Sequence, residues 1–585
     1  MIQKFLLPLA ILTLTGCATS QMSRDIAAEP VNVRVIGLND FHGNLDPPKQ
    51  SAEAINAKGE RVWLPSGGVA YLGSAIDSLR ADAPNNVVVA AGDLIGASPL
   101  SSSLFLDEPS IIALNMIGLE FNALGNHEFD RGIAELKRIQ SGGCEKHTLA
   151  VPCRIDNPFP GAKFKQLAAN TITENGSTLF PGTALKSFGT GKSKVTIGFI
   201  GMTLKGTSNL VSAGRIAGIK FATEIDTANA LVPKLKAAGA DAIIVLIHEG
   251  LFTKTSHSDP QCTGVSGDLM PIVDGLDPAV DVVISGHTHW AYTCDYANIN
   301  PARPVLVTSA GVRGQYVSAI DLKIDPVANK VVAKSARNVV VQSEAYTRAR
   351  GTVAINTEFP VFSPRADLAE LAKRYADAAK KEESRIIGTL AGPATRDNNA
   401  AGESVLGNLI ADAQLAATKD PAMGGAQIAF MNPDGLRADV NPNPDGSVTF
   451  GSVFAAQPFS NQLVVKSFTG QQLRAVLEQQ FINANWTRVL SPSEGFRFSY
   501  DMNLPVGQRI LAMSLNGVPI RDDQKYRVAI SDFLSTGGDL FSVFVSGTDA
   551  AIGPQDIDAM IAWLSRGGLT ALPKLDRVEN RTATQ

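Results

Sequence analysis

The sequence predicts an α/β protein of two large domains, and three observations lead to this prediction. The chain has 585 residues, of which 44% are hydrophobic and 18% charged, as in ordinary globular domains. Short β-branched runs alternate with helical patterns from residue 31 to about 340. A proline-punctuated break at 347–364 separates this half from a second set of strands and helices at about 386–575. We therefore expect one domain on each side of the break.

The formal charge narrows the class of partner. Lysine and arginine number 52, against 56 aspartate and glutamate, which gives a net charge of −4. Proteins that hold nucleic-acid polymers by neutralising phosphates carry a basic excess, and this chain has none. We therefore expect no nucleic-acid polymer as a partner, and the charge predicts nothing about oligomeric state.

The first residues are typical of an export signal. Lys4 precedes an apolar run at 5–14, which is too short to span a bilayer but fits a signal peptide. The string Leu14-Thr15-Gly16-Cys17 resembles the bacterial lipobox, in which cleavage leaves the cysteine as a lipidated N-terminus. An ordinary signal peptide that contains a cysteine, or a core segment, is the alternative. We expect a signal at 1–17, lipidation of Cys17 and a tether at 18–30. The lipid anchor would hold the body at the periplasmic face of a bacterial membrane, most simply the outer membrane.

The remaining cysteines are even in number, which in an oxidising compartment suggests two disulfides. Cys144 and Cys153 close a short loop and are expected to pair, which leaves Cys262 with Cys294. Free thiols are the alternative.

The predicted elements follow the chain in order. In the first half, strands are expected at 31–38, 87–91, 121–124, 195–200, 242–247, 282–285 and 304–308, with a helical stretch at 231–238 and an excursion at 141–190. In the second half, helices are expected at 404–417 and 471–483, and strands at 427–431 and 526–531. A charged helix at 365–384 is read as the connector. The predicted bounds are 31–345 for the first domain, 346–385 for the linker, 386–575 for the second domain and 576–585 for a polar tail.

Polar side chains gather just beyond the carboxyl ends of several predicted strands. They are Asp40-Phe41-His42, Gly92-Asp93, Gly125-Asn126-His127-Glu128-Phe129-Asp130, His248-Glu249 and Gly286-His287-Thr288-His289. Ligands bind at this edge of an open α/β sheet, so the groups can converge there. A lone histidine or aspartate at a strand end is usually structural. Here five of only seven histidines fall in these strings, which favours a metal site.

The chemistry of these donors narrows the metal. Imidazoles, carboxylates and one amide suit Zn, Mn, Co or Fe rather than a thiolate-bound ion. Two such cations, sharing a carboxylate, can activate water for displacement at phosphorus.

The strings resemble the motifs of calcineurin-like metallophosphoesterases, D-x-H, G-D, G-N-H-(E/D) and G-H-T-H. Asn39-Asp40-Phe41-His42-Gly43-Asn44 and Gly92-Asp93-Leu94-Ile95-Gly96-Ala97-Ser98-Pro99 are similar to one branch, the 5'-nucleotidase / UDP-sugar hydrolase family. The resemblance covers residues from about 31 to 575. It implies an N-terminal α/β sandwich with the metal centre and a C-terminal mixed α+β domain that binds substrate.

The resemblance also implies roles for the polar residues. Asp40, His42, Asp93 and His289 would hold one divalent metal, and Asp93, Asn126, His248 and His287 a second, with Asp93 shared. His127 would be the catalytic histidine, oriented by Asp130. Capping of a helix at 131–140 is the alternative role for Asp130.

Three stretches of the second half resemble the family's substrate pocket. They are Asn432-Pro433-Asp434-Gly435-Leu436-Arg437, Gln457-Pro458-Phe459-Ser460-Asn461 and Ser531-Asp532-Phe533-Leu534-Ser535-Thr536-Gly537-Gly538-Asp539. The resemblance implies that Phe459 and Phe533 sandwich a base, Asp539 holds the ribose hydroxyls, and Asn432 and Arg437 meet polar or charged groups. A phenylalanine beside a proline is otherwise usually a core residue.

Two departures from the family pattern affect the phosphate side of this pocket. Pro433 and Asp434 replace two glycines of the usual turn. Ala400 and Ala401 stand where arginine is common, and the nearest arginine is Arg396. Specificity for nucleoside monophosphates is therefore less firmly implied than the metal chemistry.

The resemblance implies a dinuclear phosphohydrolase that converts 5'-nucleotides to nucleoside and phosphate by attack of metal-activated water on phosphorus. Rotation of the domains about the helix at 365–384 would carry substrate to the metals. UDP-sugars, dinucleotides or 2',3'-cyclic nucleotides are alternative substrates, and a thioester-type hydrolase acting on a sulfur carrier protein is a second alternative. A nucleotide-binding surface lipoprotein without turnover is the third, against which the complete ligand set argues.

Overall fold

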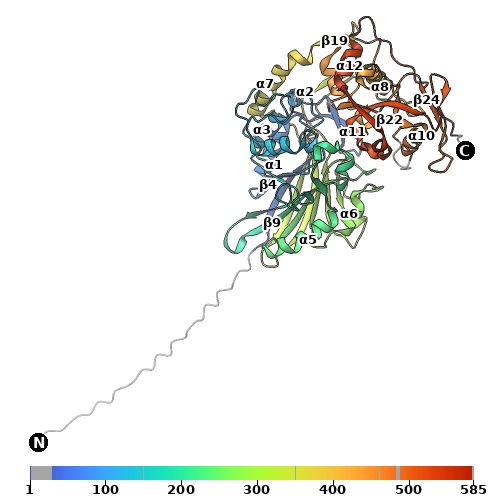
Figure 1. Ribbon diagram of the computed structural model, residues 1–585. Helices are drawn as coiled ribbons and strands as arrows, with labels where there is room; N and C mark the ends of the chain where they lie inside the picture. Colours follow the sequence, from blue (N-terminus) through green and yellow to red (C-terminus); the bar gives the residue numbers. More distant parts are fainter. Residues whose placement is uncertain (2–28, 149, 349–350, 460, 482–487, 583–585) are drawn as a thin grey trace.

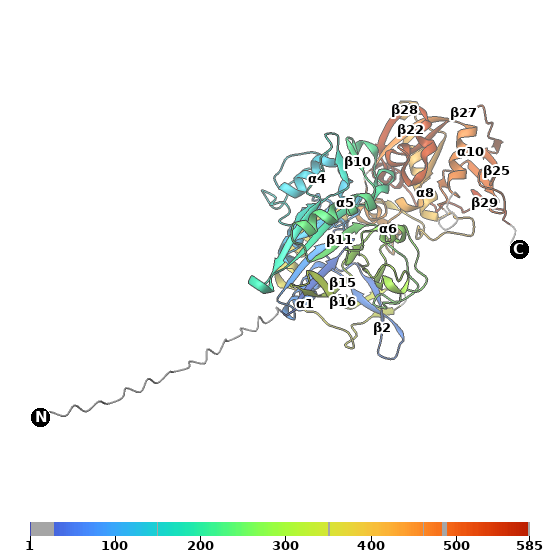
Figure 2. The same cartoon turned by 90° about the horizontal axis from the view of Figure 1, so that it is seen from below.

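The computed structural model describes residues 1, 29–148, 150–348, 351–459, 461–481 and 488–582. The predicted export signal, Cys17 and most of the predicted tether lie outside these residues. Figures 1 and 2 show two lobes, one containing β9, α5 and α6 and the other containing β22, α8 and α10.

The first domain is built on two six-stranded sheets. One sheet has the order β16-β15-β1-β4-β5-β6, with β16 (Lys330–Val340), β15 (Tyr316–Asp325), β1 (Val31–Leu38), β4 (Asn86–Ala90), β5 (Phe121–Ala123) and β6 (Lys165–Leu167). The other has the order β13-β14-β12-β11-β9-β8, with β13 (Ala291–Asp295), β14 (Leu306–Ala310), β12 (Val282–Ser285), β11 (Ala242–His248), β9 (Val195–Thr203) and β8 (Thr183–Phe188). In each sheet the central strands are parallel, so their carboxyl ends share one edge.

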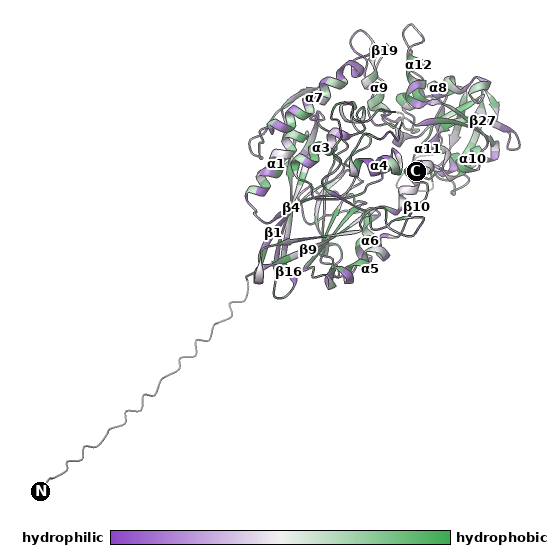
Figure 3. Ribbon diagram, turned by 60° about the vertical axis from the view of Figure 1, so that its left-hand side comes forward, coloured by the Kyte–Doolittle hydropathy of each residue, from purple (hydrophilic) through white to green (hydrophobic). Residues whose placement is uncertain are grey.

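Alternation along the strands explains how the layers stack. Val87 and Val89 of β4 lie in the core between the two sheets, whereas Val88 and Ala90 lie in the core under the helices. The helices on this side include α1 (Val69–Ala81), α3 (Glu108–Ile117) and α7 (Ala366–Glu383). The second sheet is covered by α5 (Glu224–Ala237) and α6 (Leu269–Gly275). The result is the predicted sandwich, with apolar strands inside and amphipathic helices outside (Figure 3).

The smaller elements of the first domain decorate this sandwich. They are the hairpin β2 (Gln50–Ile55) and β3 (Arg61–Ser66), the pair β7 (Thr171–Thr173) and β10 (Ile219–Phe221), the pair β17 (Tyr346–Arg348) and β18 (Gly351–Val353), and the helices α2 (Leu100–Ser103) and α4 (Gly132–Ser141). The segment at 141–190, predicted as an excursion, in fact supplies the edge strands β6 and β8 to both sheets. Both predicted disulfides, Cys144–Cys153 and Cys262–Cys294, are formed.

The second domain combines a five-stranded sheet, a four-stranded sheet and a strand pair. Its strands are β19 (Ile386–Thr389), β20 (Ile428–Met431), β21 (Ser447–Thr449), β22 (Gln462–Thr469), β23 (Ser491–Pro492), β24 (Phe496–Tyr500), β25 (Ile510–Leu515), β26 (Val518–Pro519), β27 (Lys525–Ser531), β28 (Thr548–Gln555) and β29 (Val578–Asn580). Its helices are α8 (Val405–Thr418), α9 (Phe450–Ala456), α10 (Gly470–Gln479), α11 (Asp532–Ser535) and α12 (Asp556–Leu564).

The end of the chain differs from its prediction as a polar tail. β29 pairs in parallel with β24, and Val578 is buried in the core of the second domain. Arg577 holds both carboxylate oxygens of Asp412 at 2.7 Å. Such a buried bidentate pair fixes this segment to α8. Residues 577–580 therefore belong to the second domain.

Helix α7 is an integral part of the first domain rather than a free connector. Leu368, Leu371 and Tyr375 are buried in the core beneath α1 and α3. The contact with α1 is so close that a Cβ at Gly73 would lie 2.4 Å from Leu368 Cδ1. Any hinge between the domains must therefore lie after Glu383. Among the described residues, no helix is long and apolar enough to cross a membrane.

We expect Leu368→Ala to lower the free energy of unfolding of the first domain by about 2–5 kcal/mol, because it opens a cavity in that core. Urea denaturation of the full chain measures this change. Glu370→Ala, on the exposed side of the same helix, should stay within about 0.5 kcal/mol of the wild type. Equal effects of the two substitutions would show that α7 is not part of the core.

Candidate functional site

The residues predicted as metal ligands meet where the carboxyl ends of the two sheets converge. Asp40 and His42 follow β1, Asp93 follows β4, Asn126 follows β5, His248 ends β11, and His287 and His289 follow β12. Every one is buried except His287 and His289, which are half-buried. Five strands thus deliver seven donor side chains to one place.

Asp40, His42 and His289 form the first cluster. His42 Nε2 lies 3.1 Å from His289 Nε2, and His289 Nε2 lies 3.4 Å from Asp40 Oδ1. His42 Nε2 also lies 3.8 Å from both Asp40 Oδ1 and Asp93 Oδ2. One atom from each of the three residues falls within 4.8 Å of the others, a spacing that could hold a metal ion.

Asp93, His248 and His287 form the second cluster, with the same spacing. His248 Nε2 lies 3.0 Å from Asp93 Oδ2. Asn126 Oδ1 is buried nearby on the adjoining strand end without a hydrogen-bond partner, and so is His248 Nε2. Since Asp93 faces histidines of both clusters, its carboxylate is placed to be shared.

The orientation of the imidazoles shows that these clusters fit cations. His248 Nδ1 donates to the Ala91 carbonyl at 2.8 Å, and His42 Nδ1 donates to the Gly96 carbonyl at 2.9 Å. Each Nε2 therefore presents a lone pair to a carboxylate, and two acceptors need a positive charge between them. Burial alone would lower the pKa of His248, but Asp93 raises it to about 10. The fold and the two candidate sites imply divalent metal ions.

Backbone strain marks the same residues. Asp40, His42, Asp93, His287 and His289 all have left-handed φ angles, between 46° and 70°. Side chains other than glycine rarely adopt this conformation, and such strain concentrates at functional sites. Gly125 allows the closest approach, because a Cβ there would lie 2.1 Å from Asp93 Oδ1.

Glu128 holds two of these loops together. Its carboxylate accepts backbone hydrogen bonds from Asp93 at 3.0 Å, Leu94 at 2.8 Å and Gly125 at 2.6 Å. Burial and the nearby Asp93 carboxylate raise the pKa of Glu128 to about 7. The sequence placed Glu128 next to the metals without a defined task, and the structure gives it one: positioning Asp93 and Asn126.

His127 is held beside the clusters by two bonds. Its Nδ1 lies 2.7 Å from Asp130 Oδ2, and its backbone N–H donates to Asp93 Oδ1 at 2.9 Å. Burial alone would lower the pKa of His127, but the carboxylates of Asp130 and Asp93 outweigh it, and the pKa is raised. Asp130 does not cap the following helix, since Arg131 occupies the N-cap position of α4.

The second domain reaches this site through Phe459. Its ring stacks on the imidazole of His127, with centroids 5.7 Å apart and planes inclined by 8°. The Arg437 guanidinium lies over the same ring, 5.8 Å from its centroid. The predicted substrate residues and the predicted catalytic histidine are therefore in direct contact.

The other predicted substrate residues form a network behind Phe459. Asn432 Nδ2 donates to Asp539 Oδ2 at 2.7 Å, so the Asn432 amide positions that carboxylate. Burial and the neighbouring Asp434 raise the pKa of Asp539 to about 6. Phe533 packs on the turn before Asp539, because a Cβ at Gly538 would lie 2.6 Å from its ring.

The sequence analysis missed Arg488, which belongs to this network. Its guanidinium lies 2.7 Å from Asp434 Oδ2 and 3.7 Å from Asp539 Oδ1. Asp434, one of the departures from the family pattern, is thus the partner of a buried arginine. No local signal predicts this pair, because its members lie on separate stretches of the chain.

Two family models match the chain. A model described as calcineurin-like phosphoesterase matches residues 33–291, and one described as 5'-nucleotidase, C-terminal domain, matches residues 386–546. The first match contains every predicted metal ligand and His127, and the second contains every predicted substrate residue.

Relatives and a solved structure extend the same comparison. Cell wall protein Lmo0130 of Listeria monocytogenes is 30% identical over 88% of this chain and 65% of that protein, so the chain spans less than two thirds of its length. A probable 5'-nucleotidase of Treponema pallidum is 26% identical over 90% of this chain and 89% of that protein. The crystal structure of a 5'-nucleotidase precursor from Thermus thermophilus has the same fold, with a TM-score of 0.70 and 23% identity over 94% of this chain and 99% of that one.

We expect Glu128→Gln to lower metal affinity by about 10–100-fold, because an amide nitrogen would face N–H donors and release the loops that carry Asp93 and Asn126. Metal content after dialysis against graded chelator measures this. Glu145→Gln, at an exposed glutamate of the same domain, is the matched control and should bind metal like the wild type. Wild-type metal retention in Glu128→Gln would refute the positioning role.

Proposed function

Because the chain belongs to the 5'-nucleotidase family of calcineurin-like phosphoesterases, we propose that it hydrolyses 5'-nucleotides to a nucleoside and phosphate. The observation that carries this proposal is the contact between the domains. Phe459, from the predicted base pocket, lies against His127 at the edge of both donor clusters. A base held by Phe459 would therefore keep its own 5'-phosphate close to the metal centre.

The donor sets suggest how two divalent ions would be shared. Asp40, His42, Asp93 and His289 would hold one, and Asp93, Asn126, His248 and His287 the other. When bound, such ions lower the pKa of water and neutralise charge on a phosphoryl group. The mixed nitrogen and oxygen donors suit Zn, Mn, Co or Fe.

His127 would act on the reacting phosphoryl group from outside the donor clusters. The hydrogen bond to Asp130 fixes the proton on Nδ1 and turns Nε2 away from that carboxylate. With its pKa raised, the imidazole is more readily protonated. A protonated His127 can stabilise negative charge on the phosphoryl oxygens or give a proton to the leaving 5'-oxygen.

The second domain would supply recognition. Phe459 and Phe533 offer aromatic faces to a base, and such stacking contributes roughly 1–3 kcal/mol per base. Asp539, held by Asn432 and Arg488, would accept hydrogen bonds from ribose hydroxyls. Arg437, over Phe459, would meet a charged group of the substrate.

The location of the protein is part of the same proposal. One relative is named a cell wall protein, and the structural neighbour is a precursor form, which supports export of this chain. Two disulfides suit an oxidising compartment. We place the lipid anchor on Cys17, so that the enzyme meets nucleotides outside the cytoplasm.

Phosphate release from a substrate panel tests the function. With metals added, the wild type should hydrolyse AMP or UMP at least about tenfold faster than an aryl phosphate at equal concentration. His127→Ala should lower this rate by at least about 10²-fold while metal content stays at the wild-type level. His147→Ala, at a half-buried histidine outside the site, is the control. Full activity of His127→Ala, or a preference for the aryl phosphate, would overturn the proposal.

A second test uses Asp130→Asn. Losing the carboxylate removes an interaction that raises the pKa of His127, so that pKa falls. If protonated His127 is the active form, the alkaline limb of the pH profile of kcat/KM moves to lower pH, and kcat falls by about tenfold or more. Asp226→Asn, on the exposed side of α5, should leave the profile in place. An alkaline limb that does not move would show that His127 does not act as the protonated group.

A further inference from the structure

Arg313, which no motif singled out, lies beside the first cluster. It sits in the loop between β14 and β15, where its backbone N–H donates to the Asp40 carbonyl at 2.7 Å. Asn39 pins the start of this loop through its side chain, which bonds the Ala310 N–H and the Gly311 carbonyl at 2.7 Å each. Arg313 itself adopts a left-handed φ of 58°. The same turn that carries Asp40 thus fixes the starting point of the Arg313 side chain.

The charge neighbours of Arg313 come from the second domain. Burial, together with the nearby Arg437 and Arg396, lowers the pKa of Arg313 to about 10. Arg396 donates to the carbonyls of Leu436 at 3.4 Å and Arg437 at 3.1 Å, so it lies directly behind Arg437. Three guanidinium groups from two domains therefore meet next to the metal centre.

The carboxylates around this group are already engaged. Asp439 pairs with Arg396 at 3.2 Å, Asp434 with Arg488 at 2.7 Å, and Asp130 with His127 at 2.7 Å. Asp93 belongs to the donor clusters. Across the described part of the chain, neither Arg313 nor Arg437 forms an ion pair through its guanidinium, although Arg437 does lie over Phe459. Partly buried positive charges without a counter-ion are costly unless an anion joins them.

A simple charge balance indicates which anion is missing. The carboxylates of Asp40 and Asp93 offset half the charge of two divalent cations, and a phosphoryl dianion offsets the other half. A nucleoside monophosphate would thus leave Arg313 and Arg437 unneutralised. A substrate with one more phosphate would neutralise them.

We propose that Arg313 and Arg437, backed by Arg396, bind a second phosphate of the substrate, across the two domains. This inference rests on the proposed function and sharpens its substrate class to nucleoside diphosphates and related phosphate chains. The phosphoryl group to be transferred would lie at the metals, and the adjoining phosphate would lie between Arg313 and Arg437. Arg313 would take the place of the arginines that the sequence lacks at Ala400 and Ala401, from the opposite domain.

Inhibition of aryl phosphate hydrolysis tests this site without any nucleoside. Methylenediphosphonate carries two linked anionic groups and cannot be hydrolysed, whereas orthophosphate carries one. Arg313→Gln should raise the inhibition constant of methylenediphosphonate by at least about tenfold, because a charged hydrogen bond is lost, and that of orthophosphate by less than about threefold. Arg313→Lys, which keeps the charge but not the fork, should fall between Arg313→Gln and the wild type.

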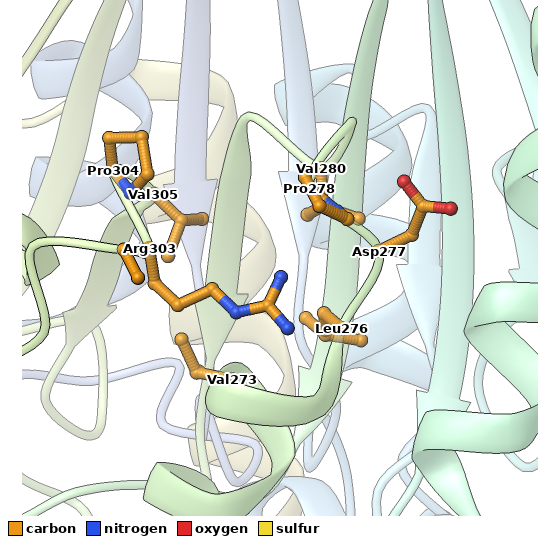
Figure 4. Close-up of a pocket in the computed structure, with 9 residues that line it drawn as sticks. Val273, Leu276, Asp277, Pro278, Val280, Arg303, Pro304 and Val305 are labelled. Atoms are coloured by element: carbon orange, nitrogen blue, oxygen red, sulfur yellow. The ribbon is translucent and has the colours of Figure 1, made fainter.

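Arg303 offers a matched control for the loss of one arginine. It lines a shallow hollow with Val273, Leu276 and Val305 at the start of β14, the opposite end of that strand from the site, and its side chain extends toward Leu276 (Figure 4). Arg303→Gln should change neither inhibition constant. Calorimetric titration of each variant with methylenediphosphonate measures the same affinities independently of turnover.

The outcomes separate this inference from the proposed function. If Arg313→Gln weakens both inhibitors equally, or neither, the second-phosphate site is wrong even for an active nucleotidase. If the wild type hydrolyses no nucleotide but Arg313→Gln selectively weakens methylenediphosphonate, the proposed function is wrong and the site stands. For nucleotides, the selective loss predicts that Arg313→Gln lowers kcat/KM for ADP at least about tenfold more than for AMP.

Discussion

Crowding of hydrogen-bond acceptors at one buried sheet edge is the constraint on which the rest of this structure depends. Imidazole lone pairs face carboxylates at His248 and Asp93 and again at His42 and Asp40. Without cations such an arrangement is unfavourable, so the surrounding chain must hold it in place. The left-handed turns after the strands, and the Glu128 carboxylate that ties them together, supply that restraint.

The division of labour between the domains follows from this constraint. The first domain spends its parallel strand ends on the donor clusters, which leaves little room there for contacts with a whole nucleotide. Recognition comes from the second domain, where Asn432, Asp539 and Arg488 form a connected polar network behind Phe459. His127 lies where the two meet, bonded to Asp130 on one side and stacked on Phe459 on the other.

Much of this arrangement could be predicted from the sequence, and what escaped prediction has a common cause. The strands, the donor strings at their ends and the disulfides are local patterns or simple pairings, so β-branched runs and residue spacing reveal them. The pair of Asp434 with Arg488 and the approach of Arg313 to Arg437 join distant segments and leave no periodic trace. The strand at 578–580 escaped for a similar reason, because its partner β24 lies far back along the chain. The buried face of α7 was visible as helical spacing, but its place in the first core was not.

The position of α7 has a geometric consequence for how the two domains can move. α7 ends at Glu383 in one core and β19 begins at Ile386 in the other, so only two residues form the covalent tether. A tether this short permits swivelling about its own bonds but almost no sliding of one domain along the other. Groups near the tether would then stay nearly still, while groups far from it would sweep along arcs. Alignment of Phe459 with His127 would therefore be set by a fixed radius from residues 384–385, much as the length of a compass arm sets the circle it draws.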